Sequence, residues 1–218
     1  MGRILRADAG WEDAVHEALR AARRPIPFDA RLLPRDDGGR AFRDRYDRTR
    51  LPPARPAATL VAIYPDRDGR LVVPLTVRHA ELRSHAGEVS LPGGSIDAAD
   101  AGVEGAALRE AWEEIGLEPG VVRVAGVLDP VWIPVSNFEL VPVVGTVAST
   151  PVLVPHDAEV AAVVELPLEA LHDEAVKVVE TFTSRGGTRS AGAYRYGGVT
   201  VWGATAITLG MLADVLDA

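Results

Sequence analysis

Glutamates are concentrated in the segment Arg109-Glu-Ala-Trp-Glu-Glu-Ile-Gly-Leu117 of this 218-residue sequence. On a helix, Glu110, Glu113 and Glu114 occupy positions i, i+3 and i+4, so we expect their carboxylates to gather on one face. Like charges at this spacing destabilise a helix by roughly a few tenths of a kcal/mol per pair, and a bound cation relieves that repulsion. Carboxylate oxygens suit Mg²⁺ or Mn²⁺. The spacing favours a divalent metal site, and a solvated acidic helix face is the alternative.

A glycine pair in Leu91-Pro-Gly-Gly94 precedes the acidic segment. Glycine lets the backbone turn tightly and approach a metal or a phosphate closely. Together with the acidic helix, this turn resembles the Nudix box, Gly-x5-Glu-x7-Arg-Glu-U-x-Glu-Glu-x-Gly-U, in which U is apolar. The positions that match are Gly94, Arg109, Glu110, Ala111, Glu113, Glu114, Gly116 and Leu117. The spacing from Gly94 to Arg109 is one residue longer than in the general box, and Asp97 and Asp100 stand near the place of the missing early glutamate.

The segment 74–94 resembles one branch of that family, the coenzyme A pyrophosphatases, which also have a lengthened box. Their upstream pattern is Leu-Leu-Thr-x-Arg-[Ser/Ala]-x3-Arg-x3-Gly-x3-Phe-Pro-Gly-Gly. The positions in register are Leu75, Thr76, Arg78, Arg83, Gly87, Pro92, Gly93 and Gly94. Departures occur at Pro74, His79 and Leu91. The resemblance extends from about Pro56 to the C-terminus.

The resemblance implies the fold class and the chemistry. The fold would be α/β, a Nudix-type α/β/α sandwich with a mixed β-sheet, and the reaction would be metal-dependent hydrolysis of a diphosphate bond with Mg²⁺ or Mn²⁺. Glu110 and Glu114 would be the firmest metal ligands, at a site that includes Gly94. Glu113 would be a further ligand or the base that activates water.

Two more residues are candidates for catalysis. Arg109 can orient a carboxylate or meet a phosphate, and a salt bridge on the helix surface is the alternative. Glu159 is a weaker candidate for a remote base or ligand, because the position of the base varies within the family. An exposed residue without a role is the alternative for Glu159.

Substrate contacts are expected from the segment upstream of the glycines. Arg78 and Arg83 can take phosphate oxygens, with structural pairing to nearby acids as an equal alternative. His85 can hydrogen-bond a phosphate, as can His79, although such histidines are more often structural. Trp132 can stack on an adenine, but core packing is the preferred interpretation. The same alternatives hold for Phe138.

The favoured substrate is coenzyme A or an acyl-coenzyme A, cleaved to 3′,5′-ADP and 4′-phosphopantetheine or its acyl form. One alternative is another nucleoside diphosphate derivative, such as ADP-ribose or a dinucleotide, or a nucleoside triphosphate. Another is a Nudix module that binds a nucleotide without hydrolysing it. The complete Arg109-Glu-x-x-Glu-Glu motif argues against this last alternative.

Composition limits the remaining functions. With 47% hydrophobic and 25% charged residues the chain is typical of a globular protein. A net charge of −8 argues against nucleic acid as a partner. The sequence has no cysteine, which excludes a cysteine nucleophile and suits a reducing cytosol. No segment has the length of an apolar membrane span, so we expect a cytoplasmic protein without a membrane partner, as a monomer or a homodimer.

The resemblance, which begins at about Pro56, implies a division into residues 1–55, packed on or extending the core, and a Nudix domain over 56–218. The first part contains a helix over 11–22 and an arginine-rich segment over 31–56, either a solvated connection or a basic arm that meets phosphates or a partner. The elements expected after it are strands at 58–64, 71–77, 121–128, 138–147, 160–166, 176–183 and 194–202, helices at 103–115 and 204–216, and a short helix near 167.

Overall fold

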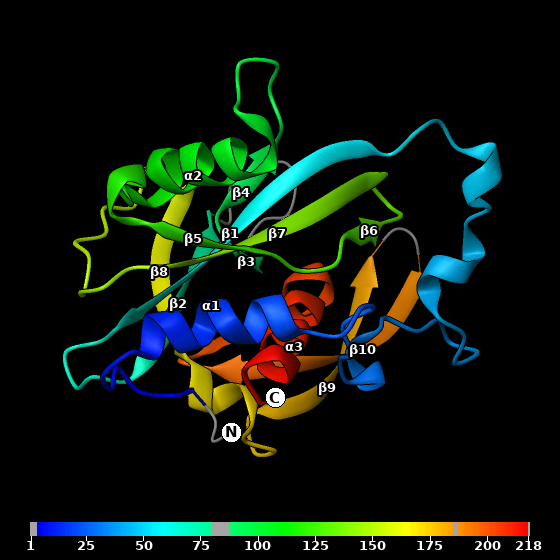
Figure 1. Ribbon diagram of the computed structural model, residues 1–218. Helices are drawn as coiled ribbons and strands as arrows, with labels where there is room; N and C mark the ends of the chain where they lie inside the picture. The colour runs from blue at the N-terminus through cyan, green and yellow to red at the C-terminus, as the bar shows by residue number, and fades with distance from the viewer. Residues whose placement is uncertain (1–3, 80–87, 185–186, 218) are drawn as a thin grey trace.

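A mixed β-sheet forms the centre of the computed structural model, which describes residues 4–79, 88–184 and 187–217 (Figure 1). The strand order is β3-β2-β1-β7-β5, with β4 on β1, β6 on β7 and β8 on β2. Strands β1 and β7 are parallel, and the other pairs are antiparallel. The bounds are β1 Arg55–Pro65, β2 Leu71–Arg78, β3 Val89–Ser90, β4 Gly93–Ser95, β5 Arg123–Val127, β6 Val131–Ile133, β7 Phe138–Thr146 and β8 Val160–Pro167.

The remaining strands form a separate antiparallel sheet in the order β11-β10-β9. Its strands are β9 Lys177–Ser184, β10 Gly187–Tyr196 and β11 Val199–Val201. The α-helices are α1 Trp11–Ala21, α2 Gly102–Ile115 and α3 Gly203–Asp217. Short 3₁₀ helices are η1 Ala30–Leu32, η2 Phe42–Arg45, η3 Arg48–Arg50, η4 Pro119–Val121 and η5 Leu168–Leu171. No helix in the described ranges is long and apolar enough to cross a membrane.

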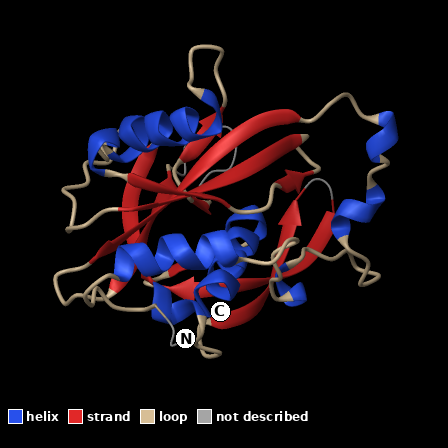
Figure 2. Cartoon of the chain, viewed as in Figure 1, coloured by secondary structure: helices blue, strands red, loops and turns tan. Residues whose placement is uncertain are grey.

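The central strand β1 separates two hydrophobic cores. Val61 and Ile63 pack in the core that contains residues of α1 and α3, whereas Leu60 and Ala62 pack in the core that contains residues of α2. Successive side chains of a strand point to opposite faces, so a strand buried on both faces needs apolar residues at every position. Helices cover both faces of the sheet (Figure 2). The predicted α/β/α sandwich with a mixed sheet is confirmed.

The largest difference from the predicted elements lies near the C-terminus. The single strand predicted over 194–202 is wrong: β10 ends at Tyr196, the chain reverses, and β11 begins at Val199. Gly197 and Gly198 have φ of 57° and 81°, in the left-handed region that glycine adopts readily. Two adjacent glycines therefore make a hairpin turn where a continuous strand was expected.

Residues before β1 pack onto the rest of the fold. Helix α1 contributes Val15 and Leu19 to the core that contains Ile63. The segment that follows includes η1, η2 and η3, and Arg35 forms a β-bridge with Ser190 of β10. In Figure 1 this segment lies at the edge of the molecule, near β6 and β10. The division into 1–55 and 56–218 stays a prediction.

Candidate active site

Helix α2 brings its acidic residues to the glycine-containing strand β4. Ala107, Ala111 and Ile115, spaced four residues apart, are fully buried in the core beneath the helix. The helix ends at Gly116, which has a φ of 67° and donates its N–H to the carbonyls of Ala111 and Trp112. The apolar face fixes the rotation of the helix and thereby the direction of the glutamates.

Glu110 lies against Gly94. A Cβ atom built on Gly94 would stand 2.4 Å from Glu110 Oε1 and 2.6 Å from its Cδ. On Gly93, a Cβ atom would stand 2.4 Å from the backbone oxygen of Ala58. The first glycine is therefore required by the pairing of β4 with β1, and the second leaves space for a carboxylate.

Glu114 is a buried carboxylate, with only 6% of the residue exposed. Its Oε2 atom has no hydrogen-bond partner among the described residues. Burial, and after it the charge of Glu110, raise the pKa of Glu114 to about 7, against the opposing effects of the backbone N–H of Gly93 and the charge of Arg78. Burial likewise raises the pKa of Glu110. A cation would favour the charged form of both groups.

Arg109 joins the helix to the loop that precedes it. Its Nε donates to Asp100 Oδ1 at 2.8 Å and its Nη2 to Asp100 Oδ2 at 3.0 Å. Its Nη1 donates to Glu110 Oε1 at 3.0 Å and to Glu113 Oε2 at 2.9 Å. The hydrogen bonds from Arg109 lower the pKa of Asp100. Arg109 thus orients Glu110 while neutralising part of the acidic cluster.

Glu113 is more exposed than the half-buried Glu110 and the buried Glu114. Its side chain is 55% exposed and pairs with Arg109. Across the described ranges, no group of three or more histidine, aspartate or glutamate side chains has the arrangement of a metal site. The expected convergence of three carboxylates on a metal site is therefore not seen; Arg109 bridges Glu113 and Glu110 through its Nη1, and Glu113 stays exposed. The roles predicted for Glu113, as a ligand or a base, stay predictions.

Arg78 and Glu159 lie around the same carboxylates. Arg78 is half-buried at the end of β2, and its Nε atom has no hydrogen-bond partner among the described residues. The next residue, His79, donates its backbone N–H to the carbonyl of Glu159 at 3.3 Å. The charge of the exposed Glu159 side chain raises the pKa of Glu110 and of Glu114. Arg83 and His85 lie outside the described residues.

A cleft of about 1380 Å³ adjoins this site. Gly93, Gly94 and Arg78 line it, as do Trp132 and Phe138. The two aromatic residues are half-buried, so the expectation that they pack in the core is wrong. The arginine-rich segment, for which a basic arm that meets phosphates was one of the two alternatives, also lines the cleft, through residues that the sequence did not single out: Phe42, Arg43, Asp44, Tyr46 and Arg48. The aromatic residues among the arginines were the available signal.

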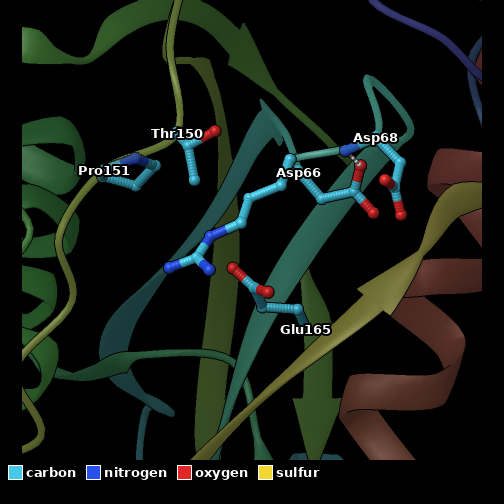
Figure 3. A pocket seen from close by; sticks show the side chains of 6 residues that line it. Asp66, Asp68, Thr150, Pro151 and Glu165 are labelled. Atoms are coloured by element: carbon cyan, nitrogen blue, oxygen red, sulfur yellow. Dashed lines mark hydrogen bonds between the residues drawn. The ribbon is translucent and has the colours of Figure 1, made fainter.

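A second, smaller pocket of about 360 Å³ lies at the turn between β1 and β2 (Figure 3). Asp66 accepts hydrogen bonds from the backbone N–H groups of Asp68 and Arg70, at 2.9 and 2.8 Å. Glu165 accepts one from the hydroxyl of Tyr64 at 2.8 Å. These carboxylates stabilise the turn and the strand pair, and none of the residues around this pocket lines the large cleft.

The chain is similar to known proteins of one family. A family model described as NUDIX domain matches residues 53–185. A Citrobacter koseri protein named "Uncharacterized Nudix hydrolase NudL" is 40% identical over 153 residues, covering 70% of this chain and 78% of the relative. Its namesake from Escherichia coli O1:K1 / APEC is 41% identical over 133 residues, covering 61% and 68%. The crystal structure of a Nudix hydrolase from M. smegmatis, RenU, is 23% identical with a TM-score of 0.47, covering 65% and 82%.

Proposed function

The chain belongs to the Nudix hydrolase family, and from this premise we propose that it cleaves the diphosphate bond of coenzyme A or an acyl-coenzyme A with Mg²⁺ or Mn²⁺. Water adds to one phosphorus atom, the bond from that atom to the bridging oxygen breaks, and the second phosphate leaves. The products are 3′,5′-ADP and 4′-phosphopantetheine, or its acyl form. The cytoplasmic location and a homodimer stay predictions.

The observation that carries the proposal is an oxygen of the buried Glu114 carboxylate that has no hydrogen-bond partner among the described residues, next to Glu110 and the backbone N–H of Gly93. A buried carboxylate oxygen without a partner is costly, and a divalent cation is the partner that suits hard oxygen ligands. The residues therefore fit a metal ion. Glu110 and Glu114 would hold it, with Glu113 or Glu159 as further ligands.

When bound, the cation would neutralise negative charge on the phosphates and make a nearby water molecule more acidic. Arg109 keeps Glu110 directed at Gly94 through the hydrogen bond at 3.0 Å. Glu113 or Glu159 accepts the proton of the attacking water. Arg78, half-buried beside the glycines, binds a phosphate oxygen of the substrate through its guanidinium group.

The choice of coenzyme A among diphosphates rests on the segment 74–94. Strand β2 carries the first part of this pattern, and β4 carries its glycine pair. Strand β2 pairs with β1 and β3, and β4 pairs with β1, so both parts of the pattern line one cleft. This arrangement supports a single substrate that contacts Arg78 and Gly94 together. Arg83 and His85 are the further phosphate contacts that the pattern predicts.

A substrate panel with Mg²⁺ tests the proposal. We expect turnover of coenzyme A, with products of the masses of 3′,5′-ADP and 4′-phosphopantetheine. ADP-ribose and a dinucleotide serve as competing substrates, and turnover of these with none of coenzyme A would overturn the substrate assignment. Glu114→Gln should abolish hydrolysis, whereas Glu104→Gln, an exposed residue of the same helix, should leave it unchanged.

A further inference from the structure

The arginine-rich segment precedes the family match at residues 53–185, yet part of it lines the active-site cleft. We propose that residues 42–48, together with Trp132, form the subsite for the nucleoside phosphate half of the substrate. Tyr46 and Trp132 would contact the base, and Arg43 would contact a phosphate. This assignment rests on the proposed function, because it places the other half of a diphosphate substrate.

Aromatic side chains line the cleft where the segment meets the sheet. The rings of Phe42 and Tyr46 have centroids 5.7 Å apart at 61°, and those of Tyr46 and Trp132 are 6.4 Å apart at 87°. Both are edge-to-face contacts within the range in which aromatic pairs attract. Tyr46 and Trp132 are half-buried, so each keeps surface available to a ligand. A planar base is the ligand group that such surface binds best.

Arginines accompany these rings. Arg43 also lines the cleft, its side chain is 58% exposed, and its Nε lies 4.0 Å from Asp44. That distance leaves the guanidinium group able to take phosphate oxygens. Arg48, in contrast, is engaged: its guanidinium carbon is 5.1 Å from the Trp132 ring centroid, and it forms a 2.5 Å ion pair with Glu139. Arg48 therefore fixes the position of the segment, and Arg43 remains for the ligand.

The segment is tied to the sheet close to the aromatic rings. Asn137, at a φ of 52°, accepts a hydrogen bond from Trp132 Nε1 at 3.1 Å and donates one to the carbonyl of Pro52 at 3.1 Å. Arg55 lies 3.9 Å over the ring of Phe138. These contacts orient Trp132 and place the chain beside it. The subsite is thus built before a ligand arrives, which reduces the entropy lost on binding.

The extent of the cleft indicates a substrate with two halves. Its volume of about 1380 Å³ exceeds the range of about 300–1000 Å³ typical of small-ligand pockets. One part of its lining is Gly94 with Arg78, which suits a diphosphate, and another is the aromatic and cationic group of residues 42–48 with Trp132. A nucleoside phosphate joined through a diphosphate matches both parts.

The test measures binding of 3′,5′-ADP to the full chain by calorimetry, with a chelator present so that no divalent cation contributes. Tyr46→Ala should weaken binding at least about fivefold, and Tyr46→Phe should retain it, because the ring and not the hydroxyl makes the stacking surface. Arg43→Ala should weaken binding of 3′,5′-ADP several-fold more than binding of adenosine. Arg50→Ala is the matched control, since Arg50 is on the same segment but does not line the cleft.

Unchanged affinity in both Tyr46→Ala and Arg43→Ala would overturn the inference, as would the absence of measurable binding in the unmodified chain. If Tyr46→Ala lowers the melting temperature, the affinity of Arg43→Ala for 3′,5′-ADP decides whether the inference stands. The exposed Arg43 side chain contributes little to folding. Hydrolysis assayed separately with Mg²⁺ distinguishes the two proposals. Binding that depends on Tyr46 without any cleavage of coenzyme A would reject the proposed function and keep the subsite.

Discussion

The carboxylate of Glu110 occupies the space that a side chain on Gly94 would fill, with the nearest oxygen 2.4 Å from the place of the absent Cβ atom. The two residues come from different elements, Gly94 from strand β4 and Glu110 from helix α2. The glycine of the motif and the glutamate of the motif are therefore parts of one contact. Four predictions follow from this contact and its neighbours.

Gly94→Ala should reduce hydrolysis about a hundredfold, because displacing a ligand by an ångström is enough for such a loss. The atom it meets is the end of the Glu110 side chain, which can move, so the melting temperature should change little. Gly93→Ala should instead destabilise the fold, because its new methyl group meets the backbone of Ala58 and Thr59. Activity and melting temperature are measured for both.

The control for the glycine variants is Gly120→Ala, since a Cβ atom there has no neighbour within 4 Å among the described residues. We expect that variant to match the unmodified chain in both measurements. Full activity in Gly94→Ala would contradict the role given to the contact.

The metal-free protein should lose stability through Glu114 as the pH rises. Burial raises the pKa of Glu114 from 4.5 to about 7, so between these values the folded chain holds a proton that the unfolded chain releases. The free energy of unfolding therefore falls over this window, by up to roughly 3 kcal/mol from this group, and is level above it. Glu114→Gln should remove that part of the pH dependence. The free energy of unfolding of the two proteins is measured in urea at pH 5 and pH 8 with a chelator present. An equal change between these pH values in both proteins would reject the assignment.

Mn²⁺ affinity should rise with pH up to about 7 and then level, because the cation competes with the proton on Glu114. Glu159→Gln should move the midpoint to lower pH, since the charge of Glu159 raises the pKa of Glu114. If Glu159 is also the base, kcat should fall strongly while Mn²⁺ still binds. Paramagnetic resonance titration and steady-state kinetics separate these effects, and an unmoved midpoint would contradict the electrostatic coupling.

Arg109→Lys should lower hydrolysis about 10- to 100-fold, the range seen when a group that orients a metal ligand is changed. Lysine keeps the charge but lacks the fork that reaches Asp100, Glu110 and Glu113 together. The matched control is Arg123→Lys. In the unmodified chain, Arg123 Nη1 donates to Asp13 on α1, away from the site. Activity in Arg109→Lys equal to that of the control would exclude an orienting role.

The elements nearest the site could be predicted well from the sequence. Helix α2 was expected over 103–115 and spans Gly102–Ile115, because its apolar residues recur at helical spacing and Gly116 ends it. The hairpin of β1 and β2 was expected from two apolar runs around the Asp66–Gly69 turn. The short strands β3, β4 and β6 were not predicted, since two or three residues carry too little pattern.

The sequence by itself determined the motif, the acidic helix and the family, because these depend on local spacing along one chain. Only the tertiary structure decided that Glu114 is buried and Glu110 half-buried, while Glu113 is exposed and paired with Arg109. Helical spacing places all three glutamates near one face but does not say where the sheet and the loop bearing Asp100 will lie. The same reason explains Tyr46 and Trp132: long-range packing, which no local pattern encodes, brings the N-terminal segment to the cleft.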